Sequence, residues 1–230
     1  MRRLFSFCLG VLVLGLLSTS RAADADFKPI FNGKNLSGWD GDPRLWSVKH
    51  GVIRGESTLT SLALTNTFLI WRGGTLKDFE LRIKFRIRNG NSGVQYRAKD
   101  LGKWVVSGYQ AEIENKQGKV GFLYEERGRK YLANVGEIVH FTADEKRNVT
   151  GALGTKEELT AKGYYKEKEW NEYLIVARGN QLEHHLNGFK TIELMDDDTA
   201  HRALEGVLAL QIHAGPPMLV EFKDILLKNL

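Results

Sequence analysis

Glu112 and Glu114 stand two residues apart in the segment SGYQAEIEN, where apolar and polar residues alternate. This period of two predicts a strand whose polar side chains, Gln110 included, share one face. The Cα atoms of the two glutamates would then lie ~6.5–7 Å apart, and carboxyl pairs that cleave glycosidic bonds are ~5–9.5 Å apart. The spacing permits acid–base chemistry on a sugar, although a strand that meets water on its polar face has the same pattern.

Two other segments repeat this design of apolar residues on one face and an amide plus an ionisable group on the other. In GVQYRA, Gln95 and Arg97 share a face, and in LALQIHAG, Gln211 and His213 do so. Amide and guanidinium groups are suited to paired hydrogen bonds with hydroxyl groups. If the three strands lie side by side, these four residues converge with the polar face of the first segment.

Charge and titration suggest roles for the converging residues. Arg97 near Glu112 would keep that carboxyl ionised, and His213 could titrate near neutral pH. Glu114 is expected to contact the sugar. Trp170 is a candidate for packing on the apolar face of a sugar ring.

Other candidate sites carry weaker signals. His184 and His185 are neighbours on a predicted strand and point to opposite faces, so they cannot ligate the same metal ion. The run 196–198 offers three aspartates to a hard cation, but a solvated acidic turn is the expected structure. Trp104 is a second candidate for stacking on a sugar.

The first 22 residues resemble a secretory signal peptide. Two arginines precede an apolar run, Leu4–Leu17, and small residues lead to Ala22. The run is shorter than the about 20 residues that a membrane span needs. Cys8, the only cysteine, lies inside this run and not at the cleavage site, where a lipid anchor would require it. We therefore expect a signal peptide over 1–22 and a secreted or periplasmic product without a membrane span.

Removal of the signal changes the charge balance. The whole chain has 33 basic and 28 acidic residues, a net charge of +5, and three arginines leave with the signal, so that the remainder carries +2. A protein that binds a polyanion normally shows a larger excess, so nucleic acid is excluded as a partner. The remainder also has no cysteine, so its stability must come from a hydrophobic core.

Short predicted strands separated by turn residues follow one another along residues 27–230. FELRIKFRIR (79–88) alternates strictly, and its mainly basic second face is either a solvated outer surface or a site for an anionic polymer. Gly179-Asn180 and Asn187-Gly188 are two-residue hairpin signals. The pattern predicts an all-β chain that forms one β-sandwich domain.

One segment, 134–169, fits this pattern poorly. It is polar and irregular, and only residues 155–163 look helical. A connection of this length is usually functional, such as a lid or the rim of a site. A surface insertion without a role is the other interpretation.

Five blocks of sequence, in order over residues 27–230, carry a resemblance to a known family. They are FNGKNLSGW (31–39), FELRIKFRIRNGNSGVQYR (79–97), GYQAEIE (108–114), EWNEYLIVARGNQLEHHLNG (169–188) and GVLALQIHAGPPMLVEFKDILLK (206–228). They resemble the 3-keto-disaccharide hydrolase domain family of exported proteins from Planctomycetes and Bacteroidetes, and the match is weakest over 134–168. The resemblance implies a concanavalin A-like jelly roll of two antiparallel sheets. It places the site on the concave sheet, with Gln95, Arg97, Gln110, Glu112, Gln211 and His213 lining it.

The resemblance also implies a reaction, the cleavage of an oxidised 3-keto glycoside or disaccharide. The carbonyl acidifies the C2 proton, a base removes it, the C1 substituent leaves by elimination, and water adds later. Glu112 or His213 is the expected base, and Arg97 is expected to polarise the carbonyl. No cofactor is fixed by the resemblance, although a divalent cation held through His213 could take the electrophilic role.

One departure from related folds bears on the mechanism. Jelly-roll glucanases hold a Glu-x-Asp-x-x-Glu run on the comparable strand, and this chain has Gln117 at the third acidic position. Double-displacement glycosidase chemistry is therefore not expected. The alternative to an enzyme is a non-catalytic carbohydrate-binding module on the same fold. The sequence predicts no oligomeric state.

Overall fold

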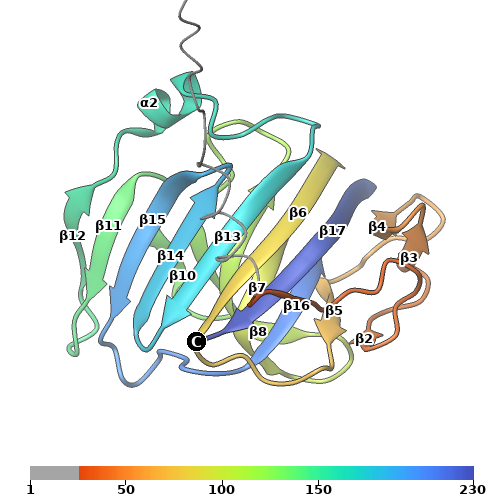
Figure 1. Cartoon of the computed structure of the whole chain (residues 1–230), viewed down its shortest axis with the longest axis horizontal. Coiled ribbons are helices and arrows are strands. Elements are labelled where there is room, and N and C mark those ends of the chain that lie inside the picture. The colour runs from red at the N-terminus through yellow and green to blue at the C-terminus, as the bar shows by residue number, and fades with distance from the viewer. Residues whose placement is uncertain (1–25) are drawn as a thin grey trace, which may run out of the picture.

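Two β-sheets stacked face to face form the protein. The structure is a computed structural model and describes residues 26–230, so the predicted signal peptide over 1–22 lies outside the described residues. In Figure 1 the larger sheet lies in front and the smaller one behind it. The all-β sandwich expected from the strand pattern is confirmed. No helix among the described residues is long and apolar enough to cross a membrane.

The larger sheet has ten strands, and one of them pairs outside the main order. In spatial order they are β12 (Arg147–Ala152), β11 (Glu137–Phe141), β15 (Phe189–Asp196), β14 (Gln181–Leu186), β13 (Asn171–Arg178), β6 (Phe79–Asn89), β17 (Met218–Asn229), β4 (Val52–Ser57) and β3 (Trp46–Lys49), with β1 (Lys28–Pro29) paired to β17. The two-residue hairpins predicted between β13 and β14 and between β14 and β15 are confirmed. The expectation of purely antiparallel sheets is wrong in one place, because β11 and β15 pair in parallel.

The smaller sheet has seven strands and contains all three segments with the repeated amide design. In spatial order it consists of β10 (Lys130–Ala133), β9 (Leu123–Glu126), β8 (Val106–Glu114), β7 (Asn91–Asp100), β16 (Val207–Ile212), β5 (Thr67–Trp71) and β2 (Trp39–Asp40). Gln95 on β7 is opposite Gln110 on β8 and opposite Ala209 on β16. The three strands are therefore neighbours, as the convergence of their polar faces requires.

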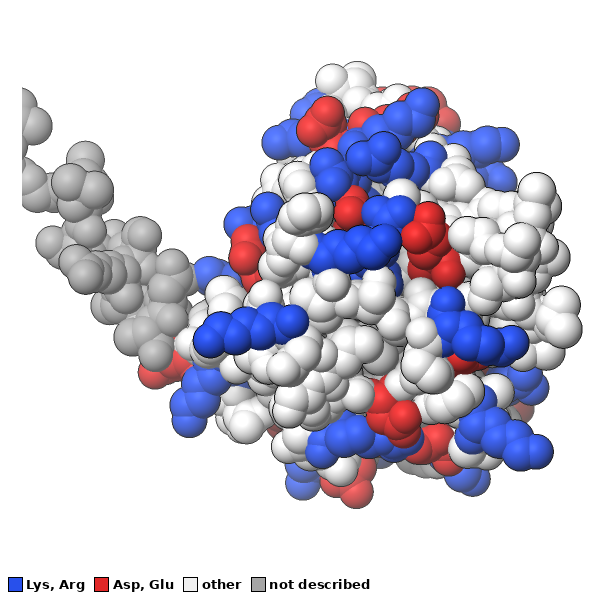
Figure 2. Space-filling model, turned by 90° about the vertical axis from the view of Figure 1, so that its right-hand side faces the viewer, with Lys and Arg blue, Asp and Glu red and all other residues white. Residues whose placement is uncertain are grey.

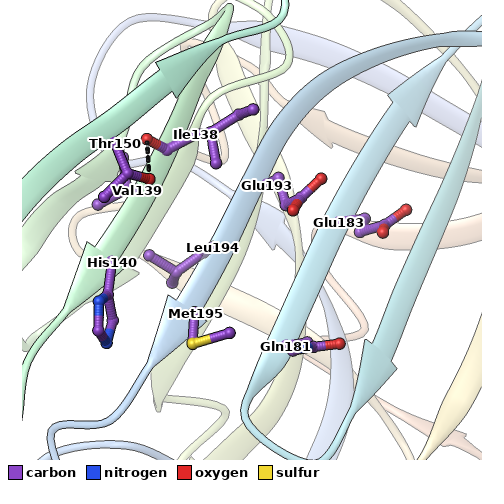
Figure 3. Close-up of a pocket in the computed structure, with 9 residues that line it drawn as sticks. All are labelled: Ile138, Val139, His140, Thr150, Gln181, Glu183, Glu193, Leu194 and Met195. Atoms are coloured by element: carbon purple, nitrogen blue, oxygen red, sulfur yellow. Dashed lines mark hydrogen bonds between the residues drawn. The ribbon is translucent and has the colours of Figure 1, made fainter.

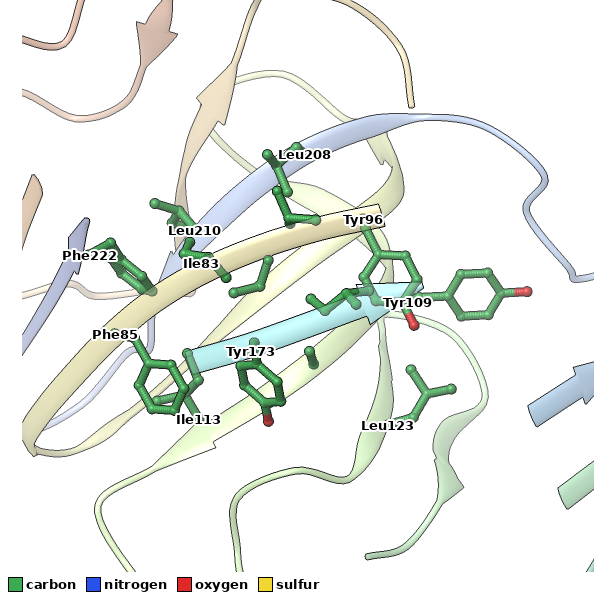
Figure 4. Close-up of a cluster of buried hydrophobic side chains, with 14 of the residues drawn as sticks. Ile83, Phe85, Tyr96, Tyr109, Ile113, Leu123, Tyr173, Leu208, Leu210 and Phe222 are labelled. Atoms are coloured by element: carbon green, nitrogen blue, oxygen red, sulfur yellow. The ribbon is translucent and has the colours of Figure 1, made fainter. Parts of the chain in front are cut away.

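The core lies between the two sheets and is rich in aromatic residues (Figure 4). Phe85 of β6 and Tyr173 of β13 stack with ring centroids 5.2 Å apart, opposite residues of β8 such as Ile113. Each buried side chain of this size contributes about 1.5–3 kcal/mol through removal of apolar surface from water. The core buries the apolar side chains on one face of β7, β8 and β16. The polar side chains that alternate with them therefore lie on the outer face of the smaller sheet.

The segment 134–169 is more regular than its polarity suggests. It contains β11, β12 and the short helix α2 (Lys156–Ala161), which falls within the helix-like stretch expected at 155–163. Thr155 and Glu158 cap this helix reciprocally: Thr155 Oγ1 accepts from the Glu158 amide at 3.1 Å, and Glu158 Oε2 accepts from the Thr155 amide at 2.8 Å. The prediction of an irregular segment is wrong because β11 obtains its hydrogen bonds from β15, a strand more than 45 residues further along the chain.

The basic row along 79–88 is an ion-paired surface. Lys84 lies 2.9 Å from an Asp224 oxygen, and Arg86 lies 2.6 Å from a Glu221 oxygen. Figure 2, which shows the end of the molecule near β3 and β4, has basic and acidic side chains interspersed in the same way. Of the two interpretations of this row, the structure supports the solvated surface.

Candidate functional site

A polar hollow of about 310 Å³ opens on the outer face of the smaller sheet, where β8, β9 and β16 end. We call it the Glu112 pocket. Twelve residues line it: Asn66, Asn91, Gln110, Glu112, Glu114, Phe122, Tyr124, Glu126, Arg127, Tyr131, Gln211 and His213. It therefore brings together five residues predicted from the sequence, namely Gln110, Glu112, Glu114, Gln211 and His213.

Glu112 is the most unusual group in this pocket. Only 3% of the residue is exposed. Gln110 Nε2 donates to one carboxyl oxygen at 2.6 Å, and the Asn91 amide donates to the other. Burial raises the pKa of Glu112 to about 8, because loss of water disfavours the charged form more than the two amide hydrogen bonds favour it. The nearby Glu114 and Glu126 carboxylates raise this pKa further.

The backbone of Glu112 is held from the other sheet. The Tyr173 hydroxyl, on β13, crosses the core and donates to the Glu112 carbonyl oxygen at 2.5 Å. Since Tyr173 is itself fully buried and stacked on Phe85, this bond fixes β8 at the point where the carboxyl group projects to the opposite face. A carboxyl group on a rigid strand is positioned more precisely than one on a loop.

A row of buried amides continues from Glu112 across the neighbouring strands. The Gln95 and Gln110 amides are in contact at 2.5 Å, and Gln110 Nε2 lies 3.4 Å from Gln211 Oε1. Gln211 is fully buried, yet its Nε2 has no hydrogen-bond partner among the described residues. An unpaired buried donor costs about 1–3 kcal/mol, so a ligand oxygen that accepts from Gln211 would relieve that cost. Gln95 supports this row without lining the pocket itself.

His213 follows the end of β16 and is exposed at the mouth of the pocket. Its Nδ1 lies 2.6 Å from the Ala214 carbonyl oxygen, which can only accept, so Nδ1 carries a proton and Nε2 is the nitrogen available to a ligand. Asn66 accepts from the Ala214 amide at 3.0 Å and donates to Glu126 at 3.1 Å. Asn66 thus connects the loop after β16 to a second acid of the pocket.

Arg97 does not lie in the pocket, which corrects the role expected for it. Its side chain is fully buried and donates to the Lys77 and Gly179 carbonyl oxygens at 2.7 and 2.6 Å. It also pairs with Asp78 at 2.9 Å. The cause is a β-bulge after Tyr96, where the register of β7 shifts and Arg97 adopts φ +47°. A bulge interrupts the alternation of faces, so Arg97 does not continue the row that Gln95 begins.

Trp170 is also absent from the pocket. It lies immediately before β13, on the larger sheet, where the Arg86 guanidinium and the Lys223 ammonium stand over its ring at 4.9 and 4.3 Å. The expectation that Trp170 stacks on the substrate is therefore wrong. Trp104 lines a different hollow and donates from its indole nitrogen to Asp40 at 2.7 Å.

Several pocket residues were not predicted from the sequence. Asn91 is opposite Glu114 in the β7–β8 pair, so the hairpin register could have indicated it. Arg127 follows β9 in a turn with φ +57°, and it is the one Lys or Arg side chain that lines the pocket within the described part of the chain. Tyr131, on β10, is 60% exposed. Arg127 and Tyr131 come from 121–133, a stretch whose pattern suggests strands but no chemistry.

The aspartate run 196–198 is not the solvated turn that was expected. Asp196 and Asp198 are buried, and Arg129 pairs with both, at 2.7 and 3.2 Å. Across residues 26–230, only Glu145, Asp198 and His201 form a group of three potential ligands whose atoms lie within 4.8 Å of one another. That group contains no residue of the Glu112 pocket.

A second hollow, of about 230 Å³, lies on the outer face of the larger sheet between β11, β14 and β15 (Figure 3). Its acids are neutralised by neighbouring cations. Lys190 lies 3.0 Å from both Glu183 and Glu193, and His185 contacts Glu183 at 2.9 Å. It contains none of the predicted site residues, and the unusual carboxyl group lies elsewhere.

Comparison with known proteins decides the family. The model of the 3-keto-alpha-glucoside-1,2-lyase-like domain matches residues 26–228. The chain belongs to this family. The resemblance seen in five blocks of sequence is thereby confirmed. A comparison of this chain with curated proteins found no match.

Solved structures confirm the fold of this lyase-like domain. Two proteins from Parabacteroides distasonis, each described as a "putative glycosyl hydrolase", have a TM-score of 0.59 and 21% identity. One alignment covers 89% of this chain and 99% of the other, and the second covers 94% and 98%. The carbohydrate-binding module CBM66 from Bacillus subtilis has a TM-score of 0.55 and 14% identity over 84% of this chain and 96% of that one. At such identities the likeness concerns the two-sheet sandwich and not the reaction.

Proposed function

We propose that the lyase-like domain is a carbohydrate-active enzyme that cleaves 3-keto-α-glucosides by elimination across C1 and C2. The observation that carries this proposal is Glu112, a buried carboxyl group with a pKa of about 8 that two amides orient at the wall of a polar pocket. A proton on carbon is weakly acidic, so its removal needs a base stronger than an ordinary carboxylate. The family name describes the same bond cleavage.

The reaction begins at C2, where the neighbouring 3-keto group acidifies the proton. Glu112 takes that proton, and the electron pair of the broken C2–H bond forms an enolate whose charge lies on the C3 oxygen. Collapse of the enolate forms the C1–C2 double bond and breaks the C1–O bond, and the leaving oxygen takes a proton. Addition of water to the unsaturated product then gives the free 3-keto sugar.

The remaining pocket groups supply the other two roles. Arg127 lines the pocket, makes no ion pair with another residue of the described range 26–230, and provides a cation for the enolate oxygen. His213 has Nε2 available and, when protonated, provides the proton for the leaving oxygen. Gln110, Gln211 and Asn91 offer amides to the sugar hydroxyl groups.

A second candidate function is sugar binding without catalysis. The likeness to the module CBM66 favours it, because that protein shares the sandwich and is described as carbohydrate-binding. In that case the pocket would bind a glucoside whether or not C3 is oxidised. Replacement of Glu112 by Gln, which has nearly the same shape, would leave the affinity unchanged.

The export expected from residues 1–22 is part of the proposal. N-terminal sequencing of the protein from a native or Gram-negative host, fractionated into cytoplasm and periplasm, tests it. A mature start at Ala23 outside the cytoplasm is expected. A full-length chain retained in the cytoplasm would contradict it.

The functional test compares an aryl 3-keto-α-glucoside with its unoxidised parent, each with and without EDTA. Turnover of the keto substrate alone is expected, together with a loss of about 10²–10⁴ in kcat/KM for Glu112→Gln. Glu157→Gln, an exposed glutamate of α2, is the matched control and should retain activity. Binding of both glucosides without turnover of either would support the sugar-binding module instead.

A further inference from the structure

Another hollow, of about 380 Å³, lies directly beside the Glu112 pocket. The two share Glu114, Phe122 and Tyr131 in their walls, so they form one continuous cleft. The far wall includes Asn134, which follows β10, and Lys156, the first residue of α2. We call this space the Lys156 hollow. The segment 134–169 therefore contributes to the rim of the cleft, which is one of the two roles expected for it.

Aromatic side chains line the junction between the two halves of the cleft. Tyr131 stands at their junction with its ring 5.5 Å from that of Phe122 and 5.3 Å from that of Tyr124, between centroids. Although it is 60% exposed, its ring is held by these two contacts. An exposed aromatic ring with restrained orientation suits the apolar face of a second sugar or aryl ring.

The sign of the charge changes along the cleft. The Glu112 pocket has three glutamates and one arginine on its walls, whereas the Lys156 hollow has two lysines and shares only Glu114 of those acids. Lys119 has only a distant partner, with its Nζ 4.0 Å from a Glu114 oxygen. Lys156 has no ion pair among the described residues, and its side chain crosses Gly118, where a Cβ would meet its Cε at 2.6 Å. Both ammonium groups are thus available to a ligand.

We propose that the Lys156 hollow binds the unit attached at C1 of the sugar and selects units that carry an anionic group. The proposal rests on the function proposed above, which places C2 at Glu112 and hence C1, one bond away, near the mouth of the same pocket. The unit at C1 then passes Tyr131, and a carboxylate, sulfate or phosphate on it meets Lys119 and Lys156. Because the charge on its walls differs between its two ends, such a cleft contributes more to specificity among ligands than to overall affinity.

The test measures binding, so that it does not depend on turnover. Unoxidised 4-carboxyphenyl α-glucoside and 4-hydroxymethylphenyl α-glucoside differ mainly in charge at the far end of the leaving group. Calorimetric titration is expected to show about three- to tenfold tighter binding of the carboxylate at low salt, with the ratio falling as salt is added. Lys156→Met and Lys119→Met should each reduce the ratio, and the double variant should bring it close to one.

Controls separate this inference from the proposed function. Lys34→Met, at an exposed lysine that lines neither hollow, should retain the full ratio. Phenyl α-glucuronide moves the carboxylate to C6 of the first sugar, and the two lysine variants should not affect its binding. Equal affinity for the charged and neutral aryl glucosides, or a lysine-dependent preference for the C6 carboxylate, would overturn the assignment. Absence of turnover with an intact binding ratio would instead reject only the proposed reaction. A sulfate or phosphate ester at the same aryl position identifies which anion binds best.

Discussion

Gln110 and Glu112 stand two residues apart on β8, and the Gln110 amide donates to the Glu112 carboxyl group at 2.6 Å. The hydrogen bond orients the Glu112 carboxyl group but stabilises its negative charge only in part. The hydrogen bond from the Gln110 amide lowers the pKa of Glu112, but burial raises this pKa by more, to about 8. The carboxyl group is therefore held in place as a base of unusual strength for its type.

The pH dependence of the reaction follows from this pKa. Glu112 must be ionised to accept a proton. With a nitrophenyl leaving group, which departs as a stable anion without a proton from His213, kcat/KM should increase about tenfold per pH unit below about 8 and level off above it. The charge of Glu114 helps to raise the pKa, and in Glu114→Gln the plateau should begin at a lower pH. Rates measured from pH 5 to 10 check both expectations. A flat profile through pH 8, or an unchanged profile in the variant, would contradict the assignment of the base.

The same group should reduce the stability of the fold at high pH. The pKa of Glu112 is higher in the folded protein than in the unfolded chain. Between about pH 4.5 and 8, Glu112 is therefore ionised only in the unfolded chain, and the free energy of unfolding falls as pH rises. Glu112→Gln does not ionise and should become more stable than the wild type by about 2–4 kcal/mol at pH 9. Urea unfolding at pH 5 and pH 9 measures the difference. It should be larger at pH 9, and equal differences at both values would argue against a raised pKa.

Arg97 should matter to stability and not to the chemistry directly. Arg97→Met leaves the Lys77 and Gly179 carbonyl oxygens without their donor and is expected to cost about 2–4 kcal/mol. Arg88→Met, at an exposed arginine of β6, should change the free energy of unfolding by less than about 0.5 kcal/mol. Urea unfolding of the two variants makes the comparison. A stable Arg97→Met protein with abolished turnover would restore Arg97 as a candidate for the site.

Arg127 is the expected electrophile of the pocket. Arg127→Met should lower kcat by about 10- to 10²-fold, less than for an enclosed oxyanion donor, because this side chain is exposed. Arg127→Lys retains the charge and should recover part of the rate. Trp170→Phe, on the other sheet, is the control and should retain the wild-type rate. If the methionine variant changed only KM, Arg127 would serve binding alone.

Much of the site could be predicted because alternation along a strand is a local property. The row of Gln110, Glu112 and Glu114 required only a period of two, and the core confirmed it by burying the other face of β8. Arg97 could not be placed in the same way. The bulge after Tyr96 depends on the pairing of β7 with β8, and no residue type in GVQYRA signals it.

The remaining errors also come from contacts between distant parts of the chain. Part of the polar segment 134–169 joins the larger sheet because β11 pairs with β15. Asp196 and Asp198 are buried because Arg129 forms ion pairs with both. Such contacts join residues more than 40 positions apart and leave no local period. Tyr131 differs, because β10 pairs with β9 in a local hairpin. Its place beside Gln211 in one pocket nevertheless depends on the pairing of β7 with β16, which are distant in the sequence.

The fate of the proton at C2 is the most direct test of the proposed elimination. An aryl 3-keto-α-glucoside with deuterium at C2 is compared with its protium form, in the wild type and in Glu112→Gln. Removal of the C2 proton by Glu112 predicts a primary isotope effect on kcat/KM in the wild type and a rate reduced by about 10²–10⁴ in the variant. Equal rates for the two substrates, with C2 deuterium retained in the sugar product, would show that the bond at C1 breaks without removal of that proton.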